Sequence, residues 1–299
     1  MDLPATGHEA VLLTEVLELL AVSEGMTVVD CTLGRGGHSS VIGQKLGKTG
    51  TLIGMDADPR NLEYAGKRLE SLPCRVRLFH ANFAEVDDVL EECQVEKVDA
   101  VLADLGLSTN QLMDPQYGMS FTGDAPLDMR IDPRSPLTAA EVVNSWPEEE
   151  LANALFELAN ERFSRRIVRK IAFRRAYSPY RTTSELVQSV YEAIGYPSPR
   201  DKINPATRTF MALRMVVNSE VENLRHLLEV IPKWLKPNGR FGVISFHSTE
   251  DRIVKQAMKL AEQTGTLAAM TKKPVVPGDE EMDRNPRSRS AKLRVARRV

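Results

Sequence analysis

The chain has 299 residues, of which 42% are hydrophobic and 27% are charged, and its formal net charge is -2. This composition is ordinary for a globular protein with one large or two modest domains, and it excludes a chain that is disordered over most of its length. The cysteines, Cys31, Cys74 and Cys93, are odd in number and form no CxxC motif. We therefore expect no disulfide framework, no metal site, and a reducing, cytoplasmic location.

The N-terminal region argues against two further classes, secreted and membrane-spanning proteins. Residues 1–4 carry no basic group, and the apolar run at 11–22 is interrupted by Glu15 and Glu18. A signal peptide needs a basic segment before its apolar core, and a membrane span needs about 20 apolar residues. We expect no membrane association, and the spacing of the apolar residues predicts an amphipathic helix over 11–22.

Residues 27–38, TVVDCTLGRGGH, predict a buried strand that runs into a glycine-rich turn. Gly34, Gly36 and Gly37 permit positive φ and let a ligand approach the backbone closely. The residues after His38 have helical spacing, so the free amides of a helix N-terminus would face the turn. Such a turn can hold NAD, FAD, a phosphate or S-adenosylmethionine, and in many proteins it is only a tight connection.

A second strand is predicted over residues 50–58, and it ends in an acid, Asp56. Asp56 lies 20 residues beyond Gly36. A carboxylate at the end of the second strand of a βαβ unit accepts hydrogen bonds from the two hydroxyls of a ribose. The alternative is a cap for the next helix, which suits Asp58 better than Asp56.

Two more strands are predicted, over residues 75–83 and 97–107. Phe83 closes the first of them, where its ring could stack on an adenine or belong to the core. Asp104 interrupts the second, which is otherwise almost continuously apolar, as a central parallel strand must be. An unpaired carboxylate is costly to bury, so Asp104 either faces a cationic ligand in the crevice or is a satisfied structural acid.

The alternation of strands and helices stops between residues 112 and 204, which we interpret as a helical insertion. Helical patterns cover residues 137–145, 147–160, 161–176 and 182–194. The segment 161–181 contains eight basic residues against the single acid Glu161, and its arginines include Arg162, Arg165, Arg166, Arg169 and Arg174. This density without acids at i,i+4 predicts contact with a phosphate backbone, and the alternative is a solvated face.

After the insertion, residues 205–235 have a helical pattern and residues 239–248 predict a strand that returns to the sheet. His247, at the carboxyl end of that strand, lies on the ligand side of the sheet or is bonded to a neighbouring loop. Residues 290–299 alternate like an edge strand that presents basic side chains, a second possible contact for a polyanion.

The predicted fold is therefore α/β, a doubly wound parallel sheet with an inserted helical domain. We expect residues 1–111 to form the first part of a cofactor-binding domain, 112–204 a substrate-recognition domain, and 205–299 the second part with a basic C-terminal tail.

Three functions are compatible with parts of this sequence. A NAD-dependent dehydrogenase would need GxGxxG, which is absent after the first strand. A non-enzymatic RNA-binding module would leave the acid-tipped crevice unexplained. A methyltransferase that uses S-adenosylmethionine accounts for the glycine turn, Asp56 and Phe83 together.

Seven strings then indicate a family. They are Asp30-Cys-Thr-Leu-Gly-Arg-Gly-Gly-His-Ser39, Asp104-Leu-Gly-Leu-Ser108 with Gln111-Leu112, Pro126-Leu-Asp-Met-Arg130, Glu161-Arg-Phe163, Pro205-Ala-Thr-Arg-Thr-Phe210, Ile244-Ser-Phe-His-Ser248 with Glu250-Asp-Arg-Ile-Val-Lys255, and Asn285-Pro-Arg-Ser-Arg-Ser290. Over nearly the whole chain, these strings resemble those of the bacterial 16S ribosomal RNA cytosine-N4 methyltransferases that act at the decoding centre.

The resemblance implies a Rossmann-like class I methyltransferase sheet, S-adenosylmethionine as cofactor, and 16S ribosomal RNA as partner, within the small ribosomal subunit. The implied cofactor-binding residues are Gly36, Gly37 and His38 for the methionine part, Asp56 for the ribose, Phe83 for the adenine, and Asp104 and Gln111 to complete the pocket. From their positions at strand ends and in loops, we expect Asp104 to orient the amino group or the cofactor. We expect His247 or Asn110 to contact the target base.

Overall fold

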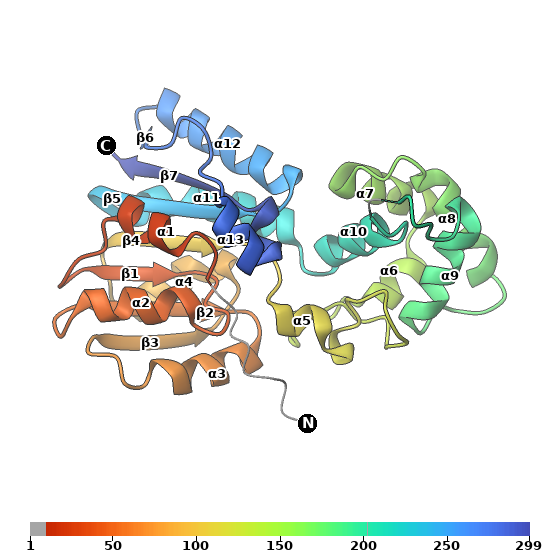
Figure 1. Ribbon diagram of the computed structural model, residues 1–299, viewed down its shortest axis with the longest axis horizontal. Coiled ribbons are helices and arrows are strands. Elements are labelled where there is room, and N and C mark those ends of the chain that lie inside the picture. The colour runs from red at the N-terminus through yellow and green to blue at the C-terminus, as the bar shows by residue number, and fades with distance from the viewer. Residues whose placement is uncertain (1–9, 202) are drawn as a thin grey trace. The chain divides into compact units, whose positions relative to one another are not determined.

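The computed structural model describes residues 10–201 and 203–299, so the N-terminal residues 1–4 considered above lie outside the described part. The chain divides into two compact units (Figure 1). The sheet unit comprises the residues up to Gly106 and Val221–Val299, and the helical unit comprises Leu107–Glu220. Each unit contains a hydrophobic core of its own.

The sheet unit is built on a seven-stranded sheet, counted over the described residues, with the order β3-β2-β1-β4-β5-β7-β6. Its strands are β1 (Thr27–Asp30), β2 (Thr51–Asp56), β3 (Arg75–His80), β4 (Val98–Asp104), β5 (Leu235–Ser245), β6 (Leu267–Ala269) and β7 (Lys292–Arg298). The first five are parallel, whereas β7 runs antiparallel to both β5 and β6. The parallel α/β sheet predicted from the sequence is confirmed.

The central strands β1 and β4 are adjacent, with Val28 paired to Ala100 and Val29 to Val101. All four of these side chains are fully buried. This burial on both faces explains the continuous apolar runs in the sequence. The chain winds outward from β1 through β2 to β3 and then returns to β4, so the strand order reverses between β1 and β4. In doubly wound sheets, ligands bind at the carboxyl ends of the strands where this reversal occurs.

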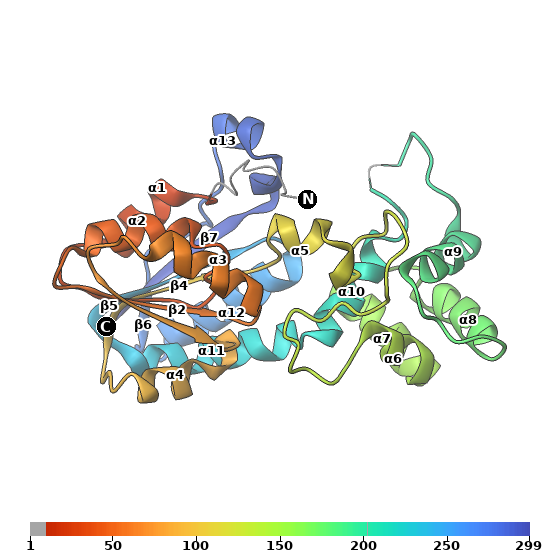
Figure 2. The same ribbon diagram turned by 90° about the horizontal axis from the view of Figure 1, so that it is seen from below.

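Helices cover both faces of the sheet. Figure 2 shows α1, α2 and α3 on one face and α4 and α11 on the other. The helices are α1 (Leu13–Leu20), α2 (Gly37–Leu46), α3 (Pro59–Leu69), α4 (Val86–Glu92), α11 (Glu220–Trp234), α12 (Ser248–Gln263) and α13 (Asp279–Arg284), with 3-10 turns η1 (Phe83–Glu85) and η3 (Pro286–Ser290). The amphipathic helix expected over 11–22 is α1, whose Val16 and Leu20 are buried.

The C-terminal strand differs from the prediction. β7 is not an edge strand, because β6 pairs with its outer side. Two of its basic side chains are also neutralised within the sheet unit: Lys292 and Arg294 contact the Asp251 carboxylate at 3.2 and 2.7 Å. The expected edge strand is therefore wrong, and an acid on α12 pairs with two of the four basic side chains of β7.

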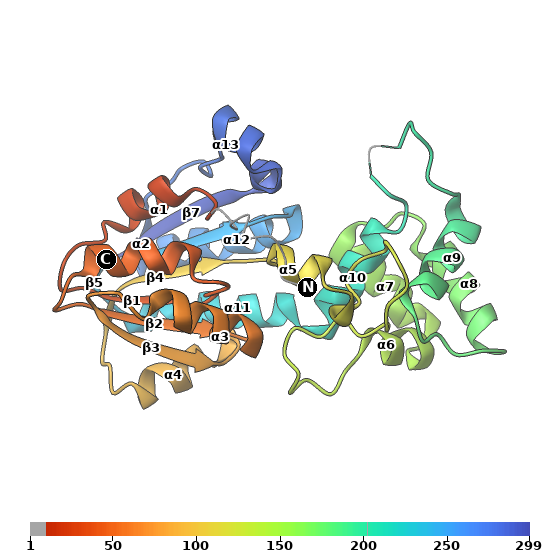
Figure 3. The same ribbon diagram turned by 60° about the horizontal axis from the view of Figure 1, so that its bottom comes forward.

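The helical unit contains α5 (Thr109–Met113), α6 (Ala139–Ser145), α7 (Glu148–Ala159), α8 (Ser164–Arg175), α9 (Thr183–Ile194), α10 (Thr207–Val217) and the 3-10 turn η2 (Pro115–Tyr117). α7 packs on α8 and α10, and α8 packs on α9 (Figure 3). Its apolar core includes Leu155, Ile167 and Leu186. The insertion predicted over residues 112–204 lies within this unit, which also includes α10.

The helical pattern at 205–235 is interrupted once. The side chain of Asn218 accepts a hydrogen bond from the Ile131 amide and donates to the Met129 carbonyl, both at 2.8 Å. Ser219 then adopts a positive φ of 49°, which ends the helical path. Two helices, α10 and α11, therefore replace the single predicted one. Among the residues described, no helix combines the length and apolar character needed to cross a membrane.

Candidate active site

The acids Asp30, Asp56 and Asp104 end three strands of the sheet unit, β1, β2 and β4. These strands are neighbours and run in the same direction. The three carboxyl groups therefore lie along one edge of the sheet, at the point where the strand order reverses. This is the edge at which the sequence predicted a ligand crevice.

A glycine turn connects β1 to α2 at this edge. Gly34 and Gly36 have φ angles of 53° and 75°, a backbone conformation that residues with a Cβ adopt at a cost of roughly 1 to 2 kcal/mol. Gly36 is the N-cap of α2 and has no side chain to satisfy the first amides of the helix. Gly37 is the first helical residue, and His38 follows it, buried. The turn lies at a helix N-terminus, whose first N–H groups have no acceptor within the helix, as the sequence predicted.

Asp56 secures this turn from β2. Its carboxylate accepts hydrogen bonds from the amides of Gly34 at 2.7 Å and Asp58 at 2.8 Å. Burial raises the pKa of Asp56 to about 6 against the lowering effect of these two amides. The structure thus reveals a positioning contact that the sequence did not indicate, and the expected contact with a ribose stays a prediction. Asp58 caps α3 by accepting from the Arg60 amide, which confirms the capping interpretation for that residue.

Asp104 lies beside the glycine turn and His38. Its Oδ2 is 3.6 Å from His38 Nδ1, while His38 Nε2 donates to the Val11 carbonyl at 2.9 Å. The Asp104 amide donates to Thr32 Oγ1 at 2.6 Å, which ties β4 to the turn. Desolvation raises the pKa of Asp104 to about 6, although the neighbouring His38 ring acts in the opposite direction. Asp104 and His38, both expected at the site, are therefore brought together.

Asp30 and Ser39 form a second tie beneath the turn. The Ser39 hydroxyl donates to Asp30 Oδ2 at 2.6 Å, and the Thr32 amide donates to Asp30 Oδ1 at 3.2 Å. Burial raises the pKa of Asp30, and the Ser39 hydrogen bond opposes this rise. Sequence reasoning did not assign Thr32 or Ser39 to the site. Hydroxyl side chains on either side of a glycine turn are the signal that could have found them.

Phe83 follows β3 at the outer end of the same edge, as the first residue of η1 and half-buried. Asn82 caps η1, because its Oδ1 accepts from the Ala84 amide at 2.9 Å, and Glu85 bonds back to the Asn82 amide at 2.6 Å. This capping box fixes the backbone that presents Phe83. The adenine contact expected of Phe83 stays a prediction.

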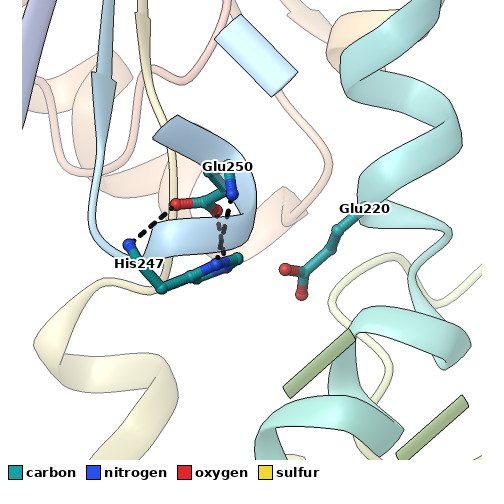
Figure 4. Close-up of side chains that lie close together, drawn as sticks. All are labelled: Glu220, His247 and Glu250. Carbon is teal, nitrogen blue, oxygen red and sulfur yellow. Dashed lines mark hydrogen bonds and ion pairs between the residues drawn. The ribbon is translucent and has the colours of Figure 1, made fainter. Parts of the chain in front are cut away.

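His247 follows β5 at the carboxyl edge and is the N-cap of α12. Figure 4 shows its ring beside Glu250: Nδ1 accepts from the Glu250 amide at 3.4 Å, and Glu250 bonds back to the His247 amide. Because Nδ1 accepts, Nε2 carries the hydrogen in the neutral ring. Nε2 lies 3.1 Å from Glu250 Oε1 but is buried without an aligned hydrogen-bond partner in the part of the chain described. His247 therefore has both a structural function and an N–H available to a ligand.

Asn110 and Gln111 belong to the helical unit, where both lie on the short helix α5. Gln111 is buried, and its Oε1 accepts from the Ser108 amide at 3.1 Å in a capping box. This contact explains locally why an amide residue lies three positions after Ser108. The contacts expected of Asn110 with the base and of Gln111 with the cofactor stay predictions.

The arginines predicted to bind RNA fall into two groups on and beside α8. Arg174 contacts Glu185 at 3.1 Å and stacks on the Tyr180 ring at 4.8 Å, so α9 supplies the acid that the local sequence lacks. The remaining four are exposed and form no ion pair with any described residue. They are Arg162, Arg165, Arg166 and Arg169.

The donors and acceptors of the sheet unit suit S-adenosylmethionine. Asp104 Oδ1 is buried and, over the described residues, has no hydrogen-bond partner. A buried carboxylate oxygen requires a donor, and the ammonium group of an amino-acid moiety supplies one. The helix N-terminus at Gly36 and Gly37 suits the carboxylate of the same moiety. Both charged ends of the methionine part therefore find a complementary group.

This sheet order, with an antiparallel β7 beside β5 and an acid-tipped switch point beside a glycine turn, defines a class I methyltransferase that uses S-adenosylmethionine. The model of the MraW methylase family matches residues 5–299. The chain belongs to that family, and the enzyme class and cofactor predicted from the sequence are confirmed.

Relatives whose sequences match almost the whole chain are named as ribosomal RNA methyltransferases. "Ribosomal RNA small subunit methyltransferase H" of Koribacter versatilis (strain Ellin345) is 46% identical, covering 97% of this chain and 94% of that protein. The protein of the same name from Brevibacillus brevis is 40% identical, covering 98% of each. Among solved structures, a rRNA methylase from Streptococcus thermophilus gives a TM-score of 0.46 at 11% identity, covering 98% of this chain and 99% of that one.

Proposed function

We propose that this enzyme transfers a methyl group from S-adenosylmethionine to the exocyclic N4 of a cytosine in the decoding centre of 16S ribosomal RNA. The names of the relatives support the ribosomal RNA substrate. The seven strings quoted above support the cytosine N4 position through the resemblance they carry. The single observation that carries the chemistry is the buried Oδ1 of Asp104 beside the glycine turn, which has no hydrogen-bond partner among the residues described.

The cofactor, when bound, supplies an electrophilic methyl group on a sulfonium. The chain's contribution is to fix where that group is held. Asp56 and Thr32 clamp the glycine turn to β2 and β4, and Ser39 clamps α2 to β1. A rigid turn suits the proposed reaction, because the cytosine amino group is a poor nucleophile whose lone pair is delocalised into the ring. Orientation of the reactants can supply up to roughly 7 to 11 kcal/mol of the barrier reduction.

We assign the recognition of the reacting groups to Asp104, His247 and Asn110. Asp104 orients the cofactor or the amino group. His247 presents an Nε2–H that suits the O2 or N3 acceptor of a cytosine, and its ring is held by Glu250. Asn110 is the further base contact. The base must leave its stack to reach these groups, at a cost on the order of a few kcal/mol that contacts to RNA must offset.

We also propose that the substrate is the RNA within the small ribosomal subunit, in the cytoplasm. A basic segment whose single acid, Glu161, is buried supports a large polyanion rather than a free nucleoside as substrate. The free cysteines Cys31, Cys74 and Cys93 are consistent with a reducing compartment.

Calorimetry and methyl transfer test this proposal together. We expect the protein to bind S-adenosylhomocysteine and not NADH, and to transfer tritiated methyl groups to small ribosomal subunits. We expect Asp104→Ala to remain folded and to lose the transfer. Binding of NADH would instead support a dehydrogenase, and RNA binding with no affinity for S-adenosylhomocysteine would support a non-enzymatic RNA-binding module. An Asp104→Ala protein with wild-type turnover would refute the function assigned to that residue.

A further inference from the structure

A stripe of basic and aromatic side chains follows one face of α8 and continues just beyond its ends. Apart from the adjacent pair Arg165 and Arg166, successive members are separated by three or four residues, the spacing that places side chains on one face of a helix. We call this set the α8 stripe: Arg162, Arg165, Arg166, Arg169, Phe173 and Tyr177. All six side chains are exposed, whereas Ile167, Val168 and Ile171 on the opposite face are buried in the core of the helical unit.

The first half of the α8 stripe carries uncompensated positive charge. Two other cations on α8 are paired with acids of α9: Lys170 contacts Glu192 at 2.6 Å and Arg174 contacts Glu185 at 3.1 Å. The nearest acid in sequence, Glu161, is buried, and its carboxylate accepts a hydrogen bond from the Phe163 amide. The four arginines of the stripe are left without an acid among the described residues. Four like charges on neighbouring turns repel one another unless an anion lies across them.

The second half of the α8 stripe is an exposed aromatic step. The rings of Phe173 and Tyr177 lie 5.5 Å apart between centroids, with 58° between their planes. Phe173 and Tyr177 are 63% and 80% exposed. Tyr180, three residues further on, is by contrast buried and bonded to Ser189 at 2.6 Å. An aromatic pair left in water beside a basic patch offers ring faces on which a base can stack.

We propose that the α8 stripe binds an unpaired segment of ribosomal RNA, with its arginines on successive phosphates and one base stacked on Phe173 or Tyr177. This inference rests on the proposed function and specifies its substrate as single-stranded RNA. A duplex would engage the arginines but not the rings, because its bases are stacked on one another inside the helix. Along this one face, the arginines suit the phosphates of an RNA strand, and the aromatic rings that follow suit a base of the same strand.

Paired substitutions separate the two halves of the α8 stripe. The probes are a short unpaired oligoribonucleotide and an RNA duplex of the same length, titrated by fluorescence anisotropy at several KCl concentrations. We expect Phe173→Ala/Tyr177→Ala to weaken binding of the single strand by roughly 5-fold to 100-fold and to leave duplex binding unchanged. We expect Arg166→Gln/Arg169→Gln to weaken both probes and to make the salt slope for the single strand shallower by about 1.4.

Matched controls remove similar groups elsewhere. Phe156→Ala deletes an exposed ring of α7 that lies outside the stripe, and Lys45→Gln/Lys48→Gln removes two exposed charges near the end of α2. Both controls should bind the probes as the wild type does. Affinity for S-adenosylhomocysteine and the urea unfolding curve should be unchanged in every variant, which shows that both units of each variant are folded.

Three results would overturn the inference. Single-strand binding by Phe173→Ala/Tyr177→Ala equal to that of Phe156→Ala would show that the rings do not stack on bases. If Phe173→Ala/Tyr177→Ala lost affinity equally for the single strand and for the duplex, the surface would be assigned to duplex RNA. Wild-type dimers that dissociate in the aromatic variant, with RNA binding intact, would assign the rings to a second copy of the chain. None of these measurements requires methyl transfer, so a failure of the proposed function is detected separately.

Discussion

The carboxyl edge of the sheet and the α8 stripe both concentrate charge, but they handle it in opposite ways. At the sheet edge, Asp30 and Asp56 are buried and accept hydrogen bonds from the glycine turn and α2. In the α8 stripe, Arg166 and Arg169 are exposed and have no acidic partner among the described residues. Buried charge that is held by the fold suits a small ligand of fixed shape. Exposed charge without a partner suits a large polyanion whose contacts form only on binding.

The largest expected effect is the loss of cofactor affinity when Asp104 is substituted. Asp104→Asn keeps the shape of the side chain but removes the charge that, in our proposal, faces the cofactor's ammonium group. We expect affinity for S-adenosylhomocysteine to fall by about 2 to 4 kcal/mol, or roughly 30-fold to 700-fold, in a calorimetric titration. Asp88→Asn, an exposed acid on α4, is the matched control and should bind normally. Equal affinities for the two variants would break the assignment of Asp104 to the cofactor.

A pH titration sharpens the same contrast. Burial raises the pKa of Asp104 to about 6, and the groups that face it are His38 on α2, Asp30 on β1 and Glu250 on α12. The cofactor's ammonium group favours the ionised carboxylate, so we expect affinity for S-adenosylhomocysteine to rise with pH up to about 6, by up to about tenfold per pH unit, and then to level off. Guanidinium groups keep their charge over this range, so RNA affinity should change much less. RNA and cofactor affinities that changed in parallel would contradict the separation.

The same pKa shift has a consequence for stability. In the cofactor-free protein, the folded state keeps protons on Asp104 and Asp56 that the unfolded chain releases near pH 3.9. The free energy of unfolding contributed by these groups is therefore fully present below about pH 4 and is lost as the pH rises through about 6. Urea melts of wild type and Asp104→Asn between these pH values measure the difference. As the pH rises, we expect the free energy of unfolding of the wild type to fall relative to that of the variant. Free energies of unfolding that changed in parallel with pH would contradict the raised pKa of Asp104.

The smallest expected effects compare two arginines of α8. Arg174→Gln removes the ion pair to Glu185, so we expect a loss of about 1 kcal/mol in the free energy of unfolding and an unchanged salt slope for RNA. Arg166→Gln removes an exposed group that has no acidic partner in the described part of the chain, so we expect unchanged stability and a slope shallower by about 0.7. Urea melts and binding titrations check both variants. A shallower salt slope for Arg174→Gln together with a loss of stability for Arg166→Gln would show that burial and pairing do not distinguish these side chains.

The sequence predicted the sheet edge well, because its features are local. An acid at the end of an apolar strand, such as Asp56 or Asp104, needs hydrogen-bond donors from a neighbouring loop or from a ligand, and parallel strands bring such ends together. The glycine turn was recognisable for a similar reason, since Gly34 and Gly36 adopt a conformation that other residues disfavour.

Contacts between distant residues could not be predicted in the same way. Arg174 looked like a free cation until α9 placed Glu185 against it, and Arg294 until α12 placed Asp251 against it. The break between α10 and α11 depends on Asn218 binding backbone groups about 90 residues earlier, at Met129 and Ile131. A single sequence reveals spacing along a helix or a strand, but it does not reveal which element packs against it.

The nucleoside product tests the central claim most directly. Small ribosomal subunits that lack the modification would be incubated with the protein and tritiated S-adenosylmethionine, and the RNA digested to nucleosides and separated by chromatography. We expect the radioactivity in N4-methylcytidine, and we expect Asp104→Asn to reduce it at subsaturating cofactor. Radioactivity in another nucleoside, or none from a protein that binds S-adenosylhomocysteine, would contradict the proposed reaction.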